Sequence, residues 1–124
     1  MPFTYVFDAA TNIVRTSAHG LIRFDDLAAH LRALIDGEVA HVPQLIDARD
    51  AQHDLTASDI RRLVELVGHL QAAHGFSHRT ALVVSTSVDF GMARMYGSLA
   101  QTVDPGFSVF RDLDEAEAWL QGAR

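Results

Sequence analysis

The most constraining feature of the sequence is the apolar run TALVVST, which spans Thr80 to Thr86 without a charged residue. A short continuous run of this kind is typical of a strand that is covered on both faces. Each face of such a strand needs a layer of other elements, and helices are the usual cover when a sheet is largely parallel. The run therefore predicts a central strand in a layered α/β fold.

Two strands are predicted at the N-terminus. The segment FTYVFD alternates aromatic residues at Phe3, Tyr5 and Phe7, which is the period of a strand with one buried face. The segment NIVRTSAHG follows after a short polar break and predicts a second strand that ends at Gly20. Because the connection is short, we expect the two strands to form an antiparallel hairpin.

Helical and strand patterns then alternate. A first helix is expected with Asp25 as its N-cap and Gly37 at its end. The strand PQLIDA follows, and then a helix that starts near Thr56 with a capping box to Asp59 and ends at Gly75. The two helices repeat apolar residues at helical spacing: Leu27, Leu31, Leu34 and Ile35 in the first, and Ile60, Leu63, Val64, Val67 and Leu70 in the second.

After the central run, the pattern predicts a helix from about Ser87 to Gln101, a strand GFSVF and a last helix DLDEAEAWL capped by Asp112. The order is β-β-α-β-α-β-α-β-α. Strands that are separated by helices should be parallel, with the first strand antiparallel at one side. We therefore predict a single α/β domain over residues 1–124, built as a five-stranded mixed sheet with four main helices.

Composition excludes several classes of function. The net charge of −6 argues against a nucleic-acid partner, because phosphate binding needs clustered cations. The ten basic residues are all arginine, which excludes a lysine Schiff base and a P-loop lysine. There is no cysteine, so a disulfide, a thiolate zinc site and a cysteine nucleophile are excluded as well. With no signal-peptide pattern and no long apolar stretch, we expect a cytoplasmic protein.

Several segments together resemble one family: LIDARD, RTALVVST, FGMARMY and VFRDLDEAEAWL, with the hairpin and Gly20 before them. They look like a small bacterial STAS-type protein, and more narrowly like the SpoIIAA-like group, which is related in fold to the anti-sigma-factor antagonists. The resemblance covers essentially the whole chain and implies no enzymatic cofactor. Members of the group are mostly uncharacterised, and their likeness to lipid-binding CRAL-TRIO domains implies small apolar ligands or membrane association.

One residue departs from the pattern of the anti-sigma-factor antagonists. Those proteins carry a phosphorylatable serine directly after an aspartate at a helix start. Here Asp47 matches the aspartate, but Ala48 stands in place of the serine. Without a hydroxyl, no phosphate can be placed there to block a partner, so the phospho-switch is not expected. Thr56 and Ser58 are hydroxyls at a helix start that capping explains.

Polar residues are expected to gather at the carboxyl ends of the strands, where ligands of parallel sheets favour binding. The segments are His19-Gly20, Asp47 to Asp50, Ser85 to Ser87, and Arg111-Asp112. In a functional interpretation they form a ligand or partner patch of Asp47, Arg49, Asp50, Ser85 and Ser87. In the structural interpretation, which the residue types favour, the same side chains brace loops and cap helices.

The helix SVDFGMARMYGSLAQ offers a second candidate. Its expected core stripe is Val88, Met92, Met95 and Leu99, with Tyr96 on the same face, while Phe90, Ala93 and Gly97 fall nearly opposite. Glycines inside a helix indicate a close approach by a neighbouring subunit, a neighbouring helix or an apolar ligand. The candidate interface or ligand helix comprises Phe90, Met92, Ala93, Arg94, Met95, Tyr96 and Gly97.

No catalytic or metal pattern is complete. Ser85 or Ser87 could mimic a hydrolase serine after a strand, but the Gly-x-Ser-x-Gly pattern is missing. His74 and His78 have the spacing of a zinc pair but span the helix end at Gly75. His53 with Asp50 and Asp54 in the loop before the helix is a weaker metal candidate. We predict no enzyme activity, no metal and no cofactor.

Three functions remain, in order. The first is a non-enzymatic STAS-like module that acts through protein–protein contact, with a homodimer and an unknown protein partner expected. The second is a binder of a small apolar molecule or a membrane lipid. The third is a serine hydrolase.

Overall fold

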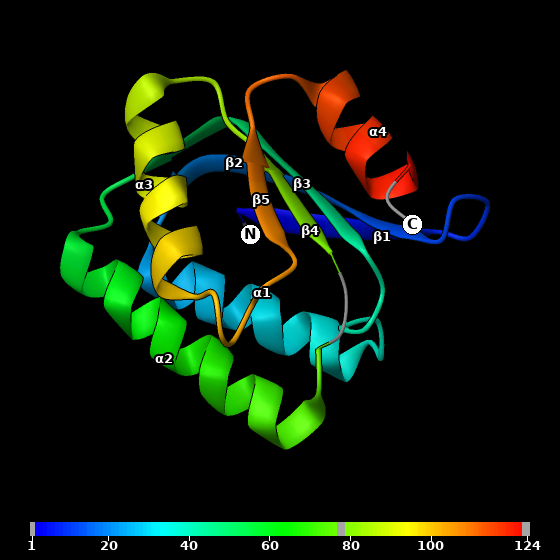
Figure 1. Ribbon diagram of the computed structural model, residues 1–124, viewed down its shortest axis with the longest axis horizontal. Helices are drawn as coiled ribbons and strands as arrows, with labels where there is room; N and C mark the ends of the chain where they lie inside the picture. Colours follow the sequence, from blue (N-terminus) through cyan, green and yellow to red (C-terminus); the bar gives the residue numbers. More distant parts are fainter. Residues whose placement is uncertain (1, 77–78, 123–124) are drawn as a thin grey trace.

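The computed structural model describes residues 2–76 and 79–122 of the 124-residue chain. Within them lie the strands β1 (Phe3–Asp8), β2 (Ile13–Ile22), β3 (Gln44–His53), β4 (Thr80–Val83) and β5 (Phe107–Phe110). The helices are α1 (Phe24–Asp36), α2 (Ala57–His74), α3 (Ser87–Leu99) and α4 (Leu113–Gly122) (Figure 1). The predicted order of strands and helices is confirmed.

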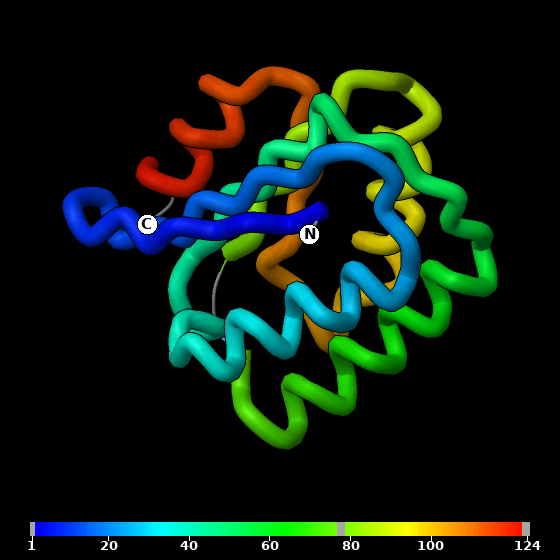
Figure 2. The backbone as a smooth tube through the Cα atoms, turned by 180° about the vertical axis from the view of Figure 1, so that it is seen from behind, coloured from blue at the N-terminus to red at the C-terminus, as the bar shows by residue number. Residues whose placement is uncertain are grey.

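The strands form one five-stranded sheet in the order β1-β2-β3-β4-β5. β1 is antiparallel to β2, with Asp8 opposite Ile13, and the remaining neighbours are parallel. This arrangement confirms the mixed sheet with its hairpin at one edge. The turn of the hairpin extends away from the helices, on the left of Figure 2.

Helices cover both faces of the sheet. α4 lies on one face, and α1, α2 and α3 lie on the other (Figure 1). Successive side chains of a strand point to opposite faces, so Leu45 packs on α4 while Gln44 and Ile46 face the other helices. β4 is apolar because helices cover both of its faces, as the run that starts at Thr80 predicted.

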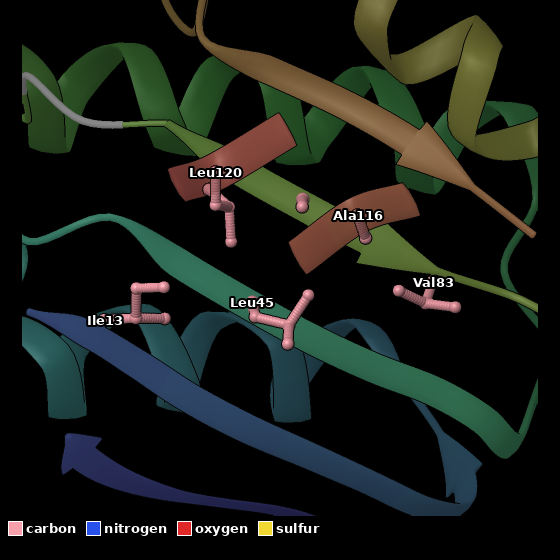
Figure 3. Close-up of a cluster of buried hydrophobic side chains, with 6 residues drawn as sticks. Ile13, Leu45, Val83, Ala116 and Leu120 are labelled. Carbon is pink, nitrogen blue, oxygen red and sulfur yellow. The ribbon is translucent and has the colours of Figure 1, made fainter. Parts of the chain in front are cut away.

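On the α4 face, small and branched side chains make a tight core. Its buried residues are Ile13, Leu45, Ala81, Val83, Ala116 and Leu120, and Figure 3 shows the strand residues directed at the helix. Phe110 and Trp119 pack beside them with ring centroids 5.5 Å apart. Each fully buried branched side chain contributes about 1.5–3 kcal/mol, so this face holds α4 firmly.

The opposite face carries two clusters of buried residues. One joins α2 and α3 through Ile60, Val67, Tyr96 and Ala100. The other joins β2 and α1 through Val14, Leu34 and Val42. α2 packs on α1 and α3, so these three helices form a continuous layer (Figure 2).

The prediction for β3 was wrong at its C-terminal end. The segment after Asp47 was expected to be a polar loop, but β3 runs on to His53. Beyond Asp47, β3 no longer pairs with β4, and β2 is the strand that pairs with it, with Ile22 opposite His53. β2 likewise continues past the predicted end at Gly20, whose φ of 70° is a conformation that glycine adopts without strain.

The predicted N-cap is confirmed for α2 and is wrong for α1. Thr56 caps α2, where its hydroxyl accepts from Asp59 N at 3.1 Å and Asp59 accepts from Thr56 N at 3.0 Å. α1 begins earlier than expected, with Arg23 rather than Asp25 at the N-cap. The reason is that Asp26 accepts from the backbone N–H of Arg23 at 2.9 Å, which stabilises the start one turn before the apolar stripe.

Candidate functional site

An apolar cavity lies between the sheet and the layer of α1, α2 and α3. Its volume is about 210 Å³, which exceeds the roughly 150 Å³ of an engineered cavity that stays dry and binds benzene. The apolar lining includes Ile46, Ala48, Leu82 and Phe107 from the sheet and Leu31, Leu63 and Met92 from the helices. The cavity can therefore hold an apolar molecule of about eight non-hydrogen atoms, by scaling from benzene.

Two buried polar side chains on the lining, His30 and Gln44, form a network with the buried Thr16. Gln44 Oε1 accepts from the hydroxyl of Thr16 at 2.7 Å and lies 2.7 Å from Nε2 of His30. An amide oxygen only accepts, so the proton of His30 is on Nε2. Burial lowers the pKa of His30, which keeps the ring neutral. The ring also stacks on Phe3, with centroids 4.7 Å apart.

A second polar pair lines the cavity near β5. The Tyr96 hydroxyl donates to Asp104 Oδ2 at 2.8 Å, and both side chains are largely removed from water. Burial raises the pKa of Asp104 above its ordinary value, although the bond from Tyr96 opposes this. Burial also raises the pKa of Tyr96, so the phenol stays protonated and serves as a donor.

His53 and Asp89 close the cavity at the C-terminal end of β3. His53 Nδ1 accepts from Leu55 N at 3.2 Å, so its Nε2 carries the proton that is shared with Asp89 Oδ1 at 2.8 Å. The pair joins the end of β3 to the first turn of α3. Gln52 also lines the cavity and is exposed beside this pair.

The polar segments predicted at the strand ends do come together, on the α4 side of the sheet. Arg49 donates to both oxygens of Asp47, at 2.9 and 2.8 Å, and this pairing lowers the pKa of Asp47. Ser85 Oγ donates to Arg49 O at 3.0 Å, and Arg111 donates to Ser87 Oγ at 3.2 Å and to Ser85 O at 3.1 Å. Asp50 is exposed and within the field of Arg49. We call Asp47, Arg49, Asp50, Ser85 and Ser87 the edge cluster.

The hydrogen bonds of the edge cluster join neighbouring segments of the chain, as expected for a structural role. Its serines bond to a backbone carbonyl and to an arginine, and in the described part of the chain neither bonds to a histidine. Across those same residues, no three or more histidine, aspartate or glutamate side chains are grouped as a metal ion would need. His78, the partner expected for His74, lies outside the described residues. Ala48 points from the edge of the cluster into the cavity on the other face.

The stripe predicted for α3 needs correction. Val88 and Leu99 are 72% and 46% exposed, whereas Ala93 and Tyr96 are buried. The cause is that α3 packs on β5 and α2 together, which turns Ala93 and Tyr96 inward and leaves the first and last turns outside. A Cβ on Gly97 would meet Phe107 at 3.4 Å, so the close approach is made by β5 of the same chain.

The other candidates on α3 separate into two groups. Met92 lines the cavity, and Met95 packs in the same helix layer. Phe90 is half-buried, and the guanidinium of Arg94 is exposed and lies 6.0 Å from its ring centroid. The face that the sequence assigned to a partner is thus mostly used inside the molecule.

His30, Gln44 and Asp104 were not among the candidates that the sequence predicted. A signal existed for two of them. His30 falls among Leu27, Leu31 and Leu34 on the apolar side of its helix, and Gln44 directly precedes the apolar pair Leu45-Ile46 in a predicted strand. A polar side chain on a face that must be buried needs a polar partner, which points to a network.

The fold is that of a known structure. An uncharacterized protein of the DUF3478 family from Shewanella loihica, which has a SpoIIAA-like fold, matches with a TM-score of 0.61 and 19% identity over 95% of this chain and 93% of that chain. The chain therefore has a SpoIIAA-like fold, as the sequence resemblance implied. No protein-family model and no curated protein sequence matches it. In the described part of the chain, no helix has the length and hydropathy that crossing a bilayer requires.

Proposed function

We propose that the protein is a non-enzymatic module that binds a small apolar molecule between its sheet and the layer of α1, α2 and α3. The observation that carries this proposal is the cavity of about 210 Å³ with its apolar lining. Ligand pockets of this type are mostly apolar and carry a few polar groups that orient the ligand. The Thr16–His30–Gln44 network supplies such groups.

Energetics support the proposal. Protein interiors are close-packed, and unfilled space costs about 24 cal/mol per Å³ in the best-studied series. The apolar side chains around the cavity of about 210 Å³ lack such packing partners where the space is unfilled. A ligand that fills the space recovers part of this packing. The size favours a small molecule over a complete two-chain membrane lipid.

The test is native mass spectrometry of the protein purified from cells, followed by solvent extraction of any bound mass. We expect a small organic molecule to accompany the protein. In parallel, toluene should raise the melting temperature in a concentration-dependent manner, because a ligand of the folded state alone stabilises it. A protein that is purified without a bound molecule, and whose melting temperature does not change with toluene, would contradict the proposal.

The second candidate function is contact with a second copy of the chain, and exposed apolar residues on a sheet edge favour it. β1 is the first strand of the sheet, and Val6 and Phe7 on it are 69% and 43% exposed. A free edge with apolar side chains can pair with the same edge of another copy.

Light scattering at micromolar concentration tests this contact, where we expect a dimer. Val6→Lys should dissociate it, while Thr4→Lys, an exposed change on the same strand, serves as the comparison for added charge. A wild-type protein that is a monomer throughout the micromolar range would rule out the self-association.

A further inference from the structure

We propose that the ligand of the cavity is an uncharged molecule with an oxygen that accepts a hydrogen bond from the side-chain amide of Gln44, and that carboxylates and other anions are rejected. This inference rests on the proposed function, because it names the class of molecule for the same cavity. It follows from two independent observations, the orientation of a buried amide and the charges on the lining.

The amide of Gln44 is fixed by its neighbours. Its oxygen accepts from Thr16 and His30 at 2.7 Å each, so its nitrogen is the atom left for the cavity. Gln44 is only 4% exposed and lines the cavity, and it donates to no acceptor among the described residues. A buried donor without an acceptor is costly, so a ligand oxygen placed there gains a hydrogen bond that relieves this cost.

The charges on the lining determine whether the ligand's oxygen can belong to a carboxylate or must belong to an uncharged group. No arginine is among the described residues that line the cavity, whereas Asp89 and Asp104 both are. His30 could become cationic only against the burial that lowers its pKa. A carboxylate on the ligand would therefore be buried with no cation to compensate it, at a cost that rejects it. A hydroxyl or carbonyl oxygen accepts the same bond without that cost.

A series with one carbon skeleton separates these classes: toluene, benzyl alcohol, benzoate and benzylamine, each near the size that the cavity holds. Binding is read in the protein by the methyl signals of [methyl-¹³C]methionine in nuclear magnetic resonance titrations at pH 7.5. Met92 lines the cavity and reports occupancy, while Met95, which packs nearby without lining it, provides a comparison in the same helix.

We expect toluene and benzyl alcohol to shift the Met92 signal in a saturable manner. Benzoate should bind weaker than benzyl alcohol by about a hundredfold or more, because an unpaired buried charge costs several kcal/mol. In Gln44→Met, the affinity for benzyl alcohol should fall roughly twofold to tenfold while that for toluene changes little, since one neutral hydrogen bond is lost. Gln101→Met, the same exchange at an exposed glutamine that does not line the cavity, should change neither affinity.

The outcomes distinguish this inference from the function on which it rests. If no member of the series shifts Met92 in the wild type, the proposed function fails and the inference with it. If toluene binds but benzoate binds as tightly as benzyl alcohol, or benzylamine binds tightest, the cavity takes a ligand and the head-group inference is wrong. Equal losses for toluene and benzyl alcohol in Gln44→Met would also overturn the inference, because the effect would then be structural.

Discussion

Arg15 holds two carboxylates at once and joins the hairpin to α4. Its Nη1 and Nη2 atoms donate to Glu117 at 2.6 and 2.9 Å, and its Nε atom donates to Asp8 at 3.0 Å. A planar guanidinium suits this two-point contact, which is stronger than a single ion pair at a surface. The same bonds lower the pKa of Glu117 and of Asp8 below their ordinary values.

This contact predicts loss of stability in acid. Because the pKa of Glu117 is lower in the folded than in the unfolded chain, the stabilisation is present above its unfolded value of 4.5 and is lost as the pH falls below it. We expect Glu117→Gln to lower the urea midpoint at pH 7 and to flatten its fall between pH 5 and roughly pH 3. Glu115→Gln, an exposed change on the same helix, is the control.

The opposite result is easily recognised. If Glu117→Gln and Glu115→Gln give the same dependence of the urea midpoint on pH, the Arg15 contact does not stabilise the fold. The measurement is made by circular dichroism across the pH series at constant ionic strength, because exposed ion pairs are screened by salt.

At the scale of single residues, contacts between sequence neighbours could be predicted, and contacts between residues far apart in the sequence could not. Asp112 accepts from Glu115 N at 3.1 Å, as its position before an apolar helix predicted. In contrast, the partners of Gln44 come from β2 and α1, 28 and 14 positions away in the sequence. No local pattern indicates which distant side chain a buried amide meets, so the network emerged only in three dimensions.

At the scale of elements, the capping box of α2 carries a measurable part of the stability. Thr56 and Asp59 satisfy each other's backbone N–H groups at the start of the longest helix. We expect Thr56→Ala to destabilise the protein by about 1 kcal/mol, the usual cost of losing an N-cap. Ser58→Ala, two residues later and exposed, should stay within about 0.5 kcal/mol of the wild type in urea denaturation.

Equal effects of the two substitutions would mean that α2 is fixed by its packing on α1 and α3 and gains nothing from the cap. This alternative has a physical basis, since Ile60 and Val67 are buried along the same helix. Most helical stability in proteins comes from such packing, which is why the control at Ser58 is essential.

The elements that sequence patterns predicted poorly are those whose cause lies outside them. The second half of β3 has polar residues in no strand period, and it is extended because β2 pairs with it through Ile22 and His53. The buried side of α3 was predicted wrongly because α3 packs against two elements, β5 and α2, which lie on different sides of it. The hairpin and the caps at Thr56 and Asp112, whose causes are local, were predicted correctly, whereas the cap of α1 was displaced from Asp25 to Arg23.

At the scale of the whole molecule, the two faces of the sheet are packed differently. The α4 face is filled by close contact of small and branched side chains, whereas the face toward α1, α2 and α3 encloses a cavity of about 210 Å³. An apolar residue that lines a cavity and one that fills a core are chemically alike, so the apolar pattern of a strand does not reveal a cavity. The hydrophobic periodicity of the sequence therefore predicted the layers of the fold but not the cavity between two of them.

The asymmetry predicts that the cavity face accepts added volume. Ala48 lines the cavity from β3, so Ala48→Leu would place three further carbon atoms in apolar space. We expect the free energy of unfolding to rise by about 1–2 kcal/mol, since each buried methylene group contributes about 0.8 kcal/mol and some fit is lost. In the proposed function the same change also reduces toluene binding, because it occupies the ligand's space.

Ala118→Leu provides the matched comparison, since Ala118 is exposed on α4 and the substitution adds the same atoms to the surface. Its free energy of unfolding should stay within about 0.5 kcal/mol of the wild type, and its toluene binding should be unchanged. Urea denaturation with and without saturating toluene measures both quantities for each variant. If Ala48→Leu lowered stability as overpacking of a filled core does, by about 1–3 kcal/mol, there would be no free space beside β3 for a ligand to enter.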